Sequence, residues 1–98
     1  MKGSREPTLT QFRLLAVVRQ AQSLSGAAKR LGISQPAVSQ RARELEDRCG
    51  VALFDRGTCT TDLTSDGERI ANQAQRVLEE YEHLLSLIGD LAKERVRT

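Results

Sequence analysis

The stretch that decides the fold is SGAAKRLGISQPAVSQRAREL, residues 25–45. It predicts two helices joined by about three residues, which is the spacing of a helix-turn-helix. Ser25 is the expected N-cap of the first helix, and Gly32 is its expected C-terminal cap, because glycine adopts the left-handed conformation without strain. Ser34 caps the second helix, and Pro36 lies in its first turn, where a missing N–H costs nothing.

The second helix, predicted from Ser34 to Cys49 and stopped by Gly50, has two different faces. At about 100° per residue, an apolar arc runs through Val38, Ala42 and Leu45, and it predicts the core side. The opposite stripe carries Gln35, Pro36, Ser39, Gln40 and Arg43. Short amides and hydroxyls on the exposed N-terminal face of a helix suit the base edges of the DNA major groove. A merely solvated helix face is the alternative for such a stripe.

The flanking segments complete a winged domain. Before the pair, Thr8 and Gln11 predict a capping box that starts a helix fading at Gln22. After it, 51–54 and 61–63 predict two short strands joined by a turn over 55–60, and this hairpin is the expected wing. Arg56 is the candidate wing contact with the flanking minor groove. The expected fold class is therefore mainly α: three helices and a two-stranded wing, followed by a long helix.

That last helix, capped by Thr64 or by Ser65 in a capping box with Glu68, has an apolar heptad seam. Its members recur at alternating steps of four and three, with two neighbours that widen the stripe: Ile70, Ala74, Val77, Leu78, Tyr81, Leu84, Leu85, Ile88 and Leu91. Because the body is small, it cannot bury the whole seam. We therefore expect the seam to pair with the same helix of a second copy. The predicted division is 1–64 for the winged domain and 65–98 for the dimerisation helix.

Charge is divided unevenly along the chain. Residues 1–43 hold eight basic side chains and one acidic, a net charge of +7, whereas residues 44–98 hold seven basic and twelve acidic, a net charge of −5. A basic half predicts a polyanionic partner, here double-stranded DNA, although a solvated basic face would have the same composition. The chain has only 3% aromatic residues and no stacking platform, which disfavours single-stranded RNA as the partner.

Other function classes lack support in the sequence. No carboxylate pair, Ser/His/Asp set or glycine-rich phosphate loop is evident, so we expect no enzyme and no cofactor. His83 is alone and off the seam, so a metal site is not expected. Without a membrane span or a secretory signal, a cytoplasmic location is expected, with Cys49 and Cys59 as free thiols. A redox switch at Cys59 is the less favoured alternative.

Residues 23–40, together with Leu45-Glu46, Gly50-Val51-Ala52-Leu53-Phe54-Asp55-Arg56 and Leu63-Thr64-Ser65-Asp66-Gly67, closely resemble the DNA-binding domain of LysR-type transcriptional regulators. The resemblance covers the chain from about Leu9 to Leu91. It implies a bacterial transcription factor domain that binds a pseudo-palindromic operator as a dimer, with paired linker helices. By this resemblance the family's larger C-terminal domain, which would bind a small-molecule effector and support higher oligomers, is missing. The expected chain is either an excised domain, which is the favoured interpretation, or an unusual stand-alone regulator.

On the family's pattern, Gln35, Pro36, Ser39 and Gln40 contact bases. Ser25 and Ser34 would be caps that contact phosphates, and Arg56 would make the DNA contact of the wing. Two departures stand out: the family often has arginine where Gln40 stands, and its wings commonly carry further basic residues that 57–62 lack. The depleted wing and acidic second half leave one alternative function, an interaction module that keeps the fold without useful DNA affinity.

Overall fold

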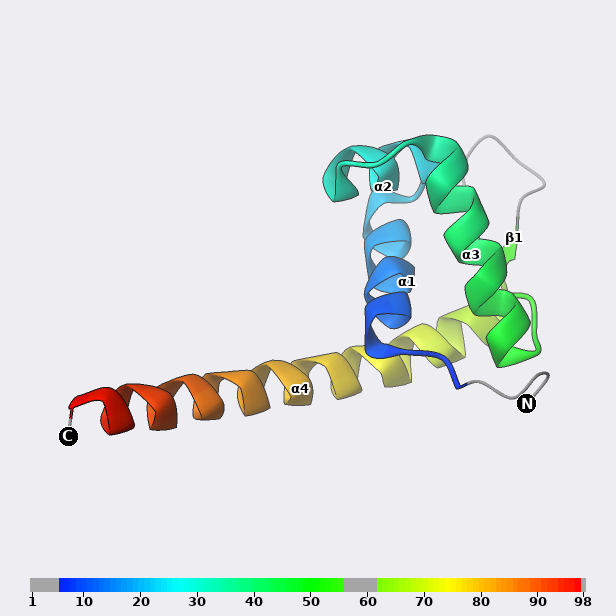
Figure 1. Ribbon diagram of the computed structural model, residues 1–98. Helices are drawn as coiled ribbons and strands as arrows, with labels where there is room; N and C mark the ends of the chain where they lie inside the picture. Colours follow the sequence, from blue (N-terminus) through cyan, green and yellow to red (C-terminus); the bar gives the residue numbers. More distant parts are fainter. Residues whose placement is uncertain (1–5, 56–61, 98) are drawn as a thin grey trace.

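The computed structural model describes residues 6–55 and 62–97. Its elements are α1 (Leu9–Ala21), α2 (Leu24–Leu31), α3 (Gln35–Cys49), β1 (Phe54–Asp55), β2 (Asp62–Leu63) and α4 (Ser65–Arg97). Figure 1 shows α1, α2 and α3 gathered into a small body, while α4 crosses that body and continues far beyond it. The predicted winged helix-turn-helix with a long last helix is confirmed.

The helix boundaries follow local capping chemistry. Thr8 and Gln11 form the predicted capping box, each side chain accepting from the other's backbone N–H at 3.1 and 3.0 Å. Gly32 and Gly50 end α2 and α3 with φ of 68° and 76°, where a side chain would be strained. These ends agree with the sequence prediction.

The core lies where the three short helices meet the base of the wing and the start of α4. Its apolar side chains are Leu14, Leu15, Val18, Ala27, Ala28, Val38, Ala42, Leu45, Leu53, Phe54, Ala71 and Ala74. Burial of each fully buried leucine or valine stabilises the folded state by about 1.5–3 kcal/mol relative to an exposed side chain. The alanine pair on α2 lets that short helix lie close to its neighbours, as its small side chains predict.

The wing strands are shorter than the sequence predicted. Residues 51–53 are not part of β1, whose ladder with β2 pairs only Phe54 with Leu63 and Asp55 with Asp62. The reason is that the N–H of Leu53 donates to the Glu46 carboxylate at 2.8 Å, while Thr64 already turns into α4. The expected turn over 55–60 falls mostly within residues 56–61, which lie outside the described part of the chain.

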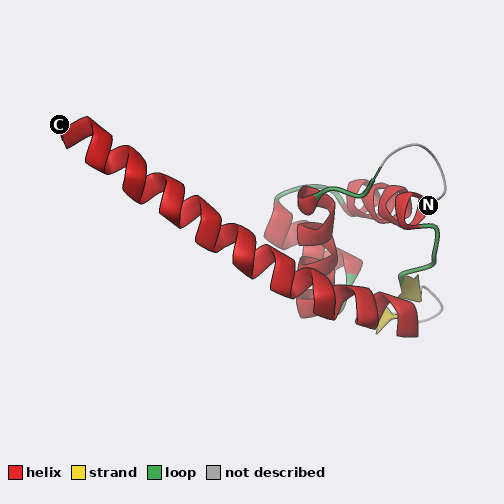
Figure 2. Cartoon of the chain, turned by 90° about the horizontal axis from the view of Figure 1, so that it is seen from below, coloured by secondary structure: helices red, strands yellow, loops and turns green. Residues whose placement is uncertain are grey.

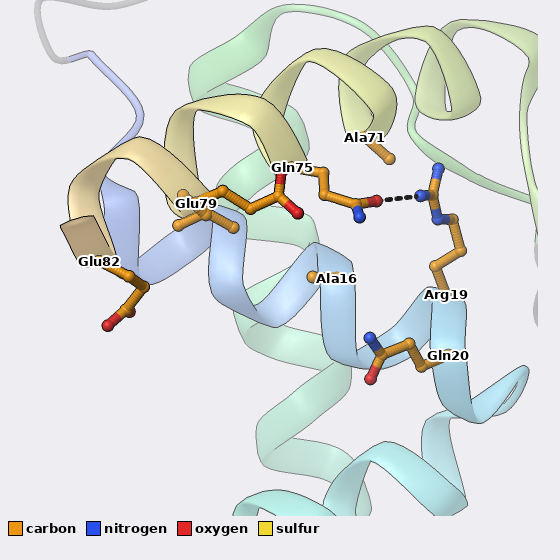
Figure 3. A pocket seen from close by; sticks show the side chains of 8 residues that line it. Ala16, Arg19, Gln20, Ala71, Gln75, Glu79 and Glu82 are labelled. Carbon is orange, nitrogen blue, oxygen red and sulfur yellow. Dashed lines mark hydrogen bonds between the residues drawn. The ribbon is translucent and has the colours of Figure 1, made fainter.

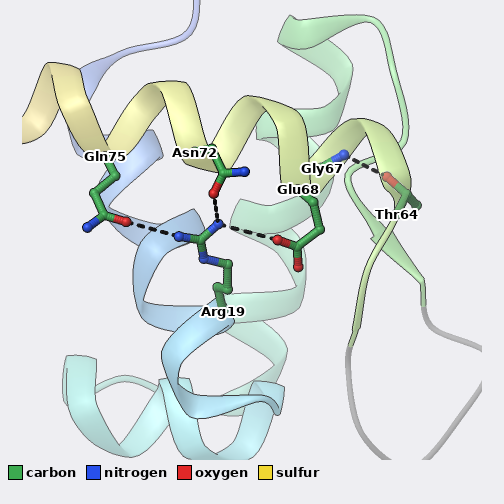
Figure 4. Close-up of polar contacts among 6 residues, drawn as sticks. All are labelled: Arg19, Thr64, Gly67, Glu68, Asn72 and Gln75. Atoms are coloured by element: carbon green, nitrogen blue, oxygen red, sulfur yellow. Dashed lines mark hydrogen bonds and ion pairs between the residues drawn. The ribbon is translucent and has the colours of Figure 1, made fainter.

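Of the two predicted caps for α4, Thr64 is correct and Ser65 is wrong. The Thr64 hydroxyl accepts from the Gly67 N–H at 2.9 Å (Figure 4). It also donates to the Ala52 carbonyl at 2.7 Å. The Glu68 carboxylate, which the sequence assigned to a capping box, instead meets Arg19 at 3.3 Å. Thr64 therefore ties the start of α4 to the chain just before β1.

We expect Thr64→Val to lower the free energy of unfolding by about 1–2 kcal/mol, because the valine keeps the shape but loses both hydrogen bonds. Thermal unfolding followed by circular dichroism measures it. Thr10→Val, at an exposed position on α1, is the matched control and should change stability by less than about 0.5 kcal/mol. Equal effects of the two changes would show that the cap does not matter.

Helix α4 has 33 residues and contacts the body mainly through its first half, with the Arg13–Glu82 ion pair just beyond it. Ala71 and Ala74 are buried and Ile70 is half-buried, whereas every described side chain from Glu82 to Val96 is exposed. Figure 2, seen from below, shows this half of the helix running free of the body. Within residues 6–55 and 62–97, no helix combines the length and apolar character needed to cross a membrane.

Candidate nucleic-acid interface

The polar stripe of α3 is held outward by the buried side of the same helix. Val38, Ala42 and Leu45 are each 0% exposed, so α3 cannot rotate about its axis without exposing apolar surface. The stripe on its other side contains exposed Gln35, Pro36, Gln40 and Arg43 and half-buried Ser39. The structure thus presents all five candidate side chains from one element, mostly from its N-terminal half.

At the N-terminus of α3, the helix cap uses part of the hydrogen-bonding capacity of Ser34. The Ser34 hydroxyl accepts from the Ala37 N–H at 3.2 Å, and the Ser34 carbonyl accepts from the Val38 N–H at 3.1 Å. Pro36 has no N–H, so Gln35 supplies the one backbone donor of the first turn that lacks an intrahelical acceptor. Ser34 is confirmed as the cap.

The cap of α2 is Ser23, and the prediction of Ser25 as this cap is wrong. The Ser23 hydroxyl accepts from the Gly26 N–H at 2.9 Å. Glycine suits position 26 of this cap, because a Cβ there would lie 2.9 Å from the Ser23 Oγ. Ser25 is instead an exposed residue of the first turn, where its N–H and that of Leu24 lack intrahelical acceptors and favour an anion.

Some basic side chains of the first half form ion pairs with acidic side chains of the second half. Arg13 forms an ion pair with Glu82 at 2.8 Å, and Arg19 meets Glu68 on the same helix, so two basic residues of the first half face acids of the second. Among the described residues of the first half, the other basic side chains are exposed on α2 and α3: Lys29, Arg30, Arg41 and Arg43. The basic surface near the polar stripe is therefore smaller than the net charge of +7 indicated.

Glu46 has a structural role that its sequence context did not predict. Its carboxylate accepts from the backbone N–H groups of Leu53 and Phe54 at 2.8 and 3.1 Å, and so joins the C-terminal half of α3 to the base of the wing. Burial, followed by the nearby Glu46 charge, raises the pKa of the half-buried Cys49 thiol. The candidate wing contact Arg56, and Cys59, lie outside the described residues.

No metal centre is evident among residues 6–55 and 62–97. No group of three or more histidine, cysteine and acidic side chains in these ranges could hold a metal ion. His83 is exposed, with its Nδ1 3.8 Å from a carboxylate oxygen of Glu80 one helical turn away.

Comparisons with known proteins agree with this arrangement. Residues 9–68 match the lysR family of bacterial regulatory helix-turn-helix proteins. An uncharacterised HTH-type transcriptional regulator of Mycobacterium tuberculosis, Rv2282c, is 40% identical over 92 residues, covering 94% of this chain and 30% of its own length. YfeR of Shigella flexneri, described in the same terms, is 37% identical over 87 residues, covering 89% of this chain and 28% of its own.

Two solved structures are also similar. The BenM DNA-binding domain in complex with benA site 1 DNA has a TM-score of 0.81 at 28% identity, covering 87% of this chain and 96% of that one. DarR of Vibrio fischeri in complex with DNA has a TM-score of 0.84 at 29% identity, covering 91% of this chain and 30% of that one. The chain spans less than a third of the length of the curated relatives it matches. With its helix-turn-helix matched from α1 to the start of α4, the chain belongs to the lysR family of bacterial regulatory helix-turn-helix proteins.

Proposed function

We propose that this chain is a sequence-specific DNA-binding unit of a transcriptional regulator, which binds a pseudo-palindromic operator as a dimer. The observation that carries the proposal is the outward stripe of short polar groups on α3, held in one orientation by three fully buried residues. A helix of this kind can enter the major groove with its N-terminal half against the base edges. The similarity to BenM and DarR, both solved with DNA, supports the proposal.

In this proposal the contacts fall into two groups. Gln35, Pro36, Ser39 and Gln40 face base edges, with Gln40 in the place of a frequent family arginine and therefore favouring adenine. Phosphates are bound by the groups that position the helix on the duplex: Ser25, Ser34, Arg43 and, on the wing, Arg56. The free N–H groups of Leu24 and Ser25 add a backbone anion site at the start of α2.

The exposed apolar side of α4 is the proposed dimer contact. Val77 lies beside the body, and Leu84, Leu85, Ile88 and Leu91 lie beyond it. All five are 41–52% exposed, which is unusual for apolar side chains without a partner. Ile70 and Ala74, at the start of the predicted seam, pack on the chain's own body instead. We therefore propose a seam from Val77 to Leu91, with Leu78 and Tyr81 at its inner border.

The proposed units are 1–64 for the DNA-binding domain and 65–98 for the linker helix. Response to a small-molecule effector, and oligomers larger than the dimer, would belong to parts that the longer relatives possess. A DNA-binding regulator of a bacterium works in the cytoplasm, which is the location we propose.

Selection of bound duplexes from a random pool tests the proposal directly. The expected result is one half-site sequence recovered twice in inverted orientation at a constant spacing. A gel shift at low salt separates this function from the alternative of an interaction module, because such a module would retard no duplex. Failure to retard any duplex would therefore contradict DNA binding.

We expect Ser39→Ala or Gln35→Ala to weaken binding to the selected duplex by about 1–3 kcal/mol and binding to random DNA very little. The physical reason is that a base edge left without its partner discriminates less, whereas phosphate contacts are unchanged. Titration on both duplexes measures the difference. Gln20→Ala, exposed on α1, is the matched control. An equal loss on both duplexes would show that these residues do not contact base edges.

A further inference from the structure

Two arginines of α1 attach the body to α4 at separate points. The Arg19 guanidinium donates to the Asn72 Oδ1 at 2.8 Å and the Gln75 Oε1 at 3.0 Å, and also meets Glu68 (Figure 4). Nearer the start of α1, Arg13 binds Glu82 at 2.8 Å and lies 5.7 Å from the centre of the Tyr81 ring. We call these two attachments the α1–α4 clamp.

Apolar packing between α1 and α4 is incomplete on the side that faces the clamp. Ala16 and Ala71 are small, and a groove of about 210 Å³ is left unfilled between the helices, with Leu78 as its one large apolar lining residue. Figure 3 shows this groove with Arg19 and Gln75 closing one end and Glu82 at the other. Small residues form low ridges, so they restrict the crossing angle of two helices less than interdigitated large side chains do.

The polar contacts of Arg19 restrict that angle where packing does not. Its acceptors stand at positions 68, 72 and 75, which lie on one face of α4 and span about 10 Å along the helix axis. Two of the three are neutral amides, so the contact depends on the fixed planar geometry of the guanidinium as well as on its charge. The Arg19 side chain is 28% exposed, which leaves it partly shielded from water.

The angle at this joint controls where the body lies relative to α4. Figure 1 shows α2 and the N-terminal end of α3 on the side of the molecule opposite α4. A tilt of about 10° displaces a point about 20 Å from the joint by about 3.5 Å, which is one base-pair step. In a dimer held together through α4, the distance between the two recognition helices depends on this tilt in both copies.

We propose that Arg19 is a positioning residue that sets the half-site spacing of the operator, by fixing the angle between the DNA-binding body and α4. The inference rests on the proposed function, because spacing has meaning only for a dimer that binds two half-sites. Arg19 itself faces α4 and contacts no base in this arrangement. Its effect is on the distance between the two α3 helices, and the half-site each one binds is unchanged.

Parallel selections from one random duplex pool test the proposal, with the wild-type chain, Arg19→Met and Arg76→Met. Arg19→Met keeps most of the aliphatic stem and removes the polar contacts of residue 19 with α4, while the Arg13–Glu82 ion pair stays in place. Arg76→Met removes the same charge from an exposed position of α4. We expect one spacing from the wild type and from Arg76→Met. From Arg19→Met we expect the same half-site sequence at spacings spread over about two base pairs or more.

Asn72→Ala keeps the charge of the clamp and removes only its shortest acceptor, so it guards against a folding defect in Arg19→Met. It should broaden the spacing in the same direction to a smaller extent. If Arg19→Met and Asn72→Ala both select the single wild-type spacing, the role of Arg19 is overturned and the proposed DNA-binding function is not affected. Loss of the half-site sequence from a folded Arg19→Met would also overturn it, because Arg19 would then act on the recognition surface. A wild-type pool without paired half-sites would overturn the proposed function and this inference together.

Discussion

Gly67→Ala is expected to destabilise the protein by about 3 kcal/mol, a large fraction of the stability of a small domain. A Cβ at Gly67 would stand 2.1 Å from the carbonyl oxygen of Leu53, and the two nearest further atoms also belong to the Leu53 backbone. That carbonyl accepts from the Thr64 N–H at 2.9 Å, so it cannot move away without breaking the bond that joins α4 to the wing. The added methyl group therefore separates the start of α4 from the core.

Thermal unfolding at a fixed protein concentration measures this loss, which corresponds to a fall of roughly 15 °C in Tm for a domain of this size. Gly89→Ala is the matched control, because a Cβ there meets nothing within 4 Å. Alanine is the better helix former, so this control should raise stability by about 0.5–1 kcal/mol. A Gly67→Ala chain as stable as the wild type would show that α4 does not approach Leu53 so closely.

Ile88→Glu is expected to convert the dimer to a monomer and to weaken binding to a two-half-site duplex at least about 100-fold, that is, by about 2.7 kcal/mol. Ile88 is 52% exposed within the proposed seam, and symmetry places two new carboxylates in one interface. Burying each charge without a partner costs several kcal/mol. Binding to a single half-site should be unchanged, because α3 is untouched.

Light scattering measures the mass of the particle, which is compared with the mass of one chain, 10.9 kDa. A protein concentration on the order of tens of micromolar suits dimers of modest affinity. Ser86→Glu adds the same charge at an exposed position off the seam and should leave the dimer intact. A dimeric Ile88→Glu chain would place the self-association surface elsewhere on the molecule. A monomeric wild type would contradict the dimer proposal itself.

Local chemistry was sufficient to predict the helix-turn-helix from the sequence. Ser34, Pro36, Gly32 and Gly50 each act within one helical turn, through a cap or a permitted backbone angle, so their effect can be inferred without knowledge of the fold. The buried arc of α3 follows from helical periodicity, and it correctly left the polar stripe exposed. The same holds for the capping box at Thr8.

Predictions that needed a distant partner were incomplete or wrong. The strand over 51–54 was too long because Glu46, seven residues before Leu53, takes its N–H. Glu68 looked like a member of a capping box, yet its partner is Arg19, 49 residues away. Ser25 was predicted as the cap of α2, whereas Ser23 is the cap, because its hydroxyl accepts from the Gly26 N–H.

By itself, then, the sequence determined which segments form helices, which face of α3 is polar and which family the motifs resemble, because these depend on neighbours within a few residues. The tertiary structure alone decided how the basic charge is divided and how the body is attached to α4. Arg13 and Arg19 look like part of a DNA-binding surface in a charge count, but they face α4 because its acids and amides lie opposite them only once α1 and α4 cross. A charge pattern records how many cations a segment has, whereas their partners depend on the packing of helices far apart in the chain.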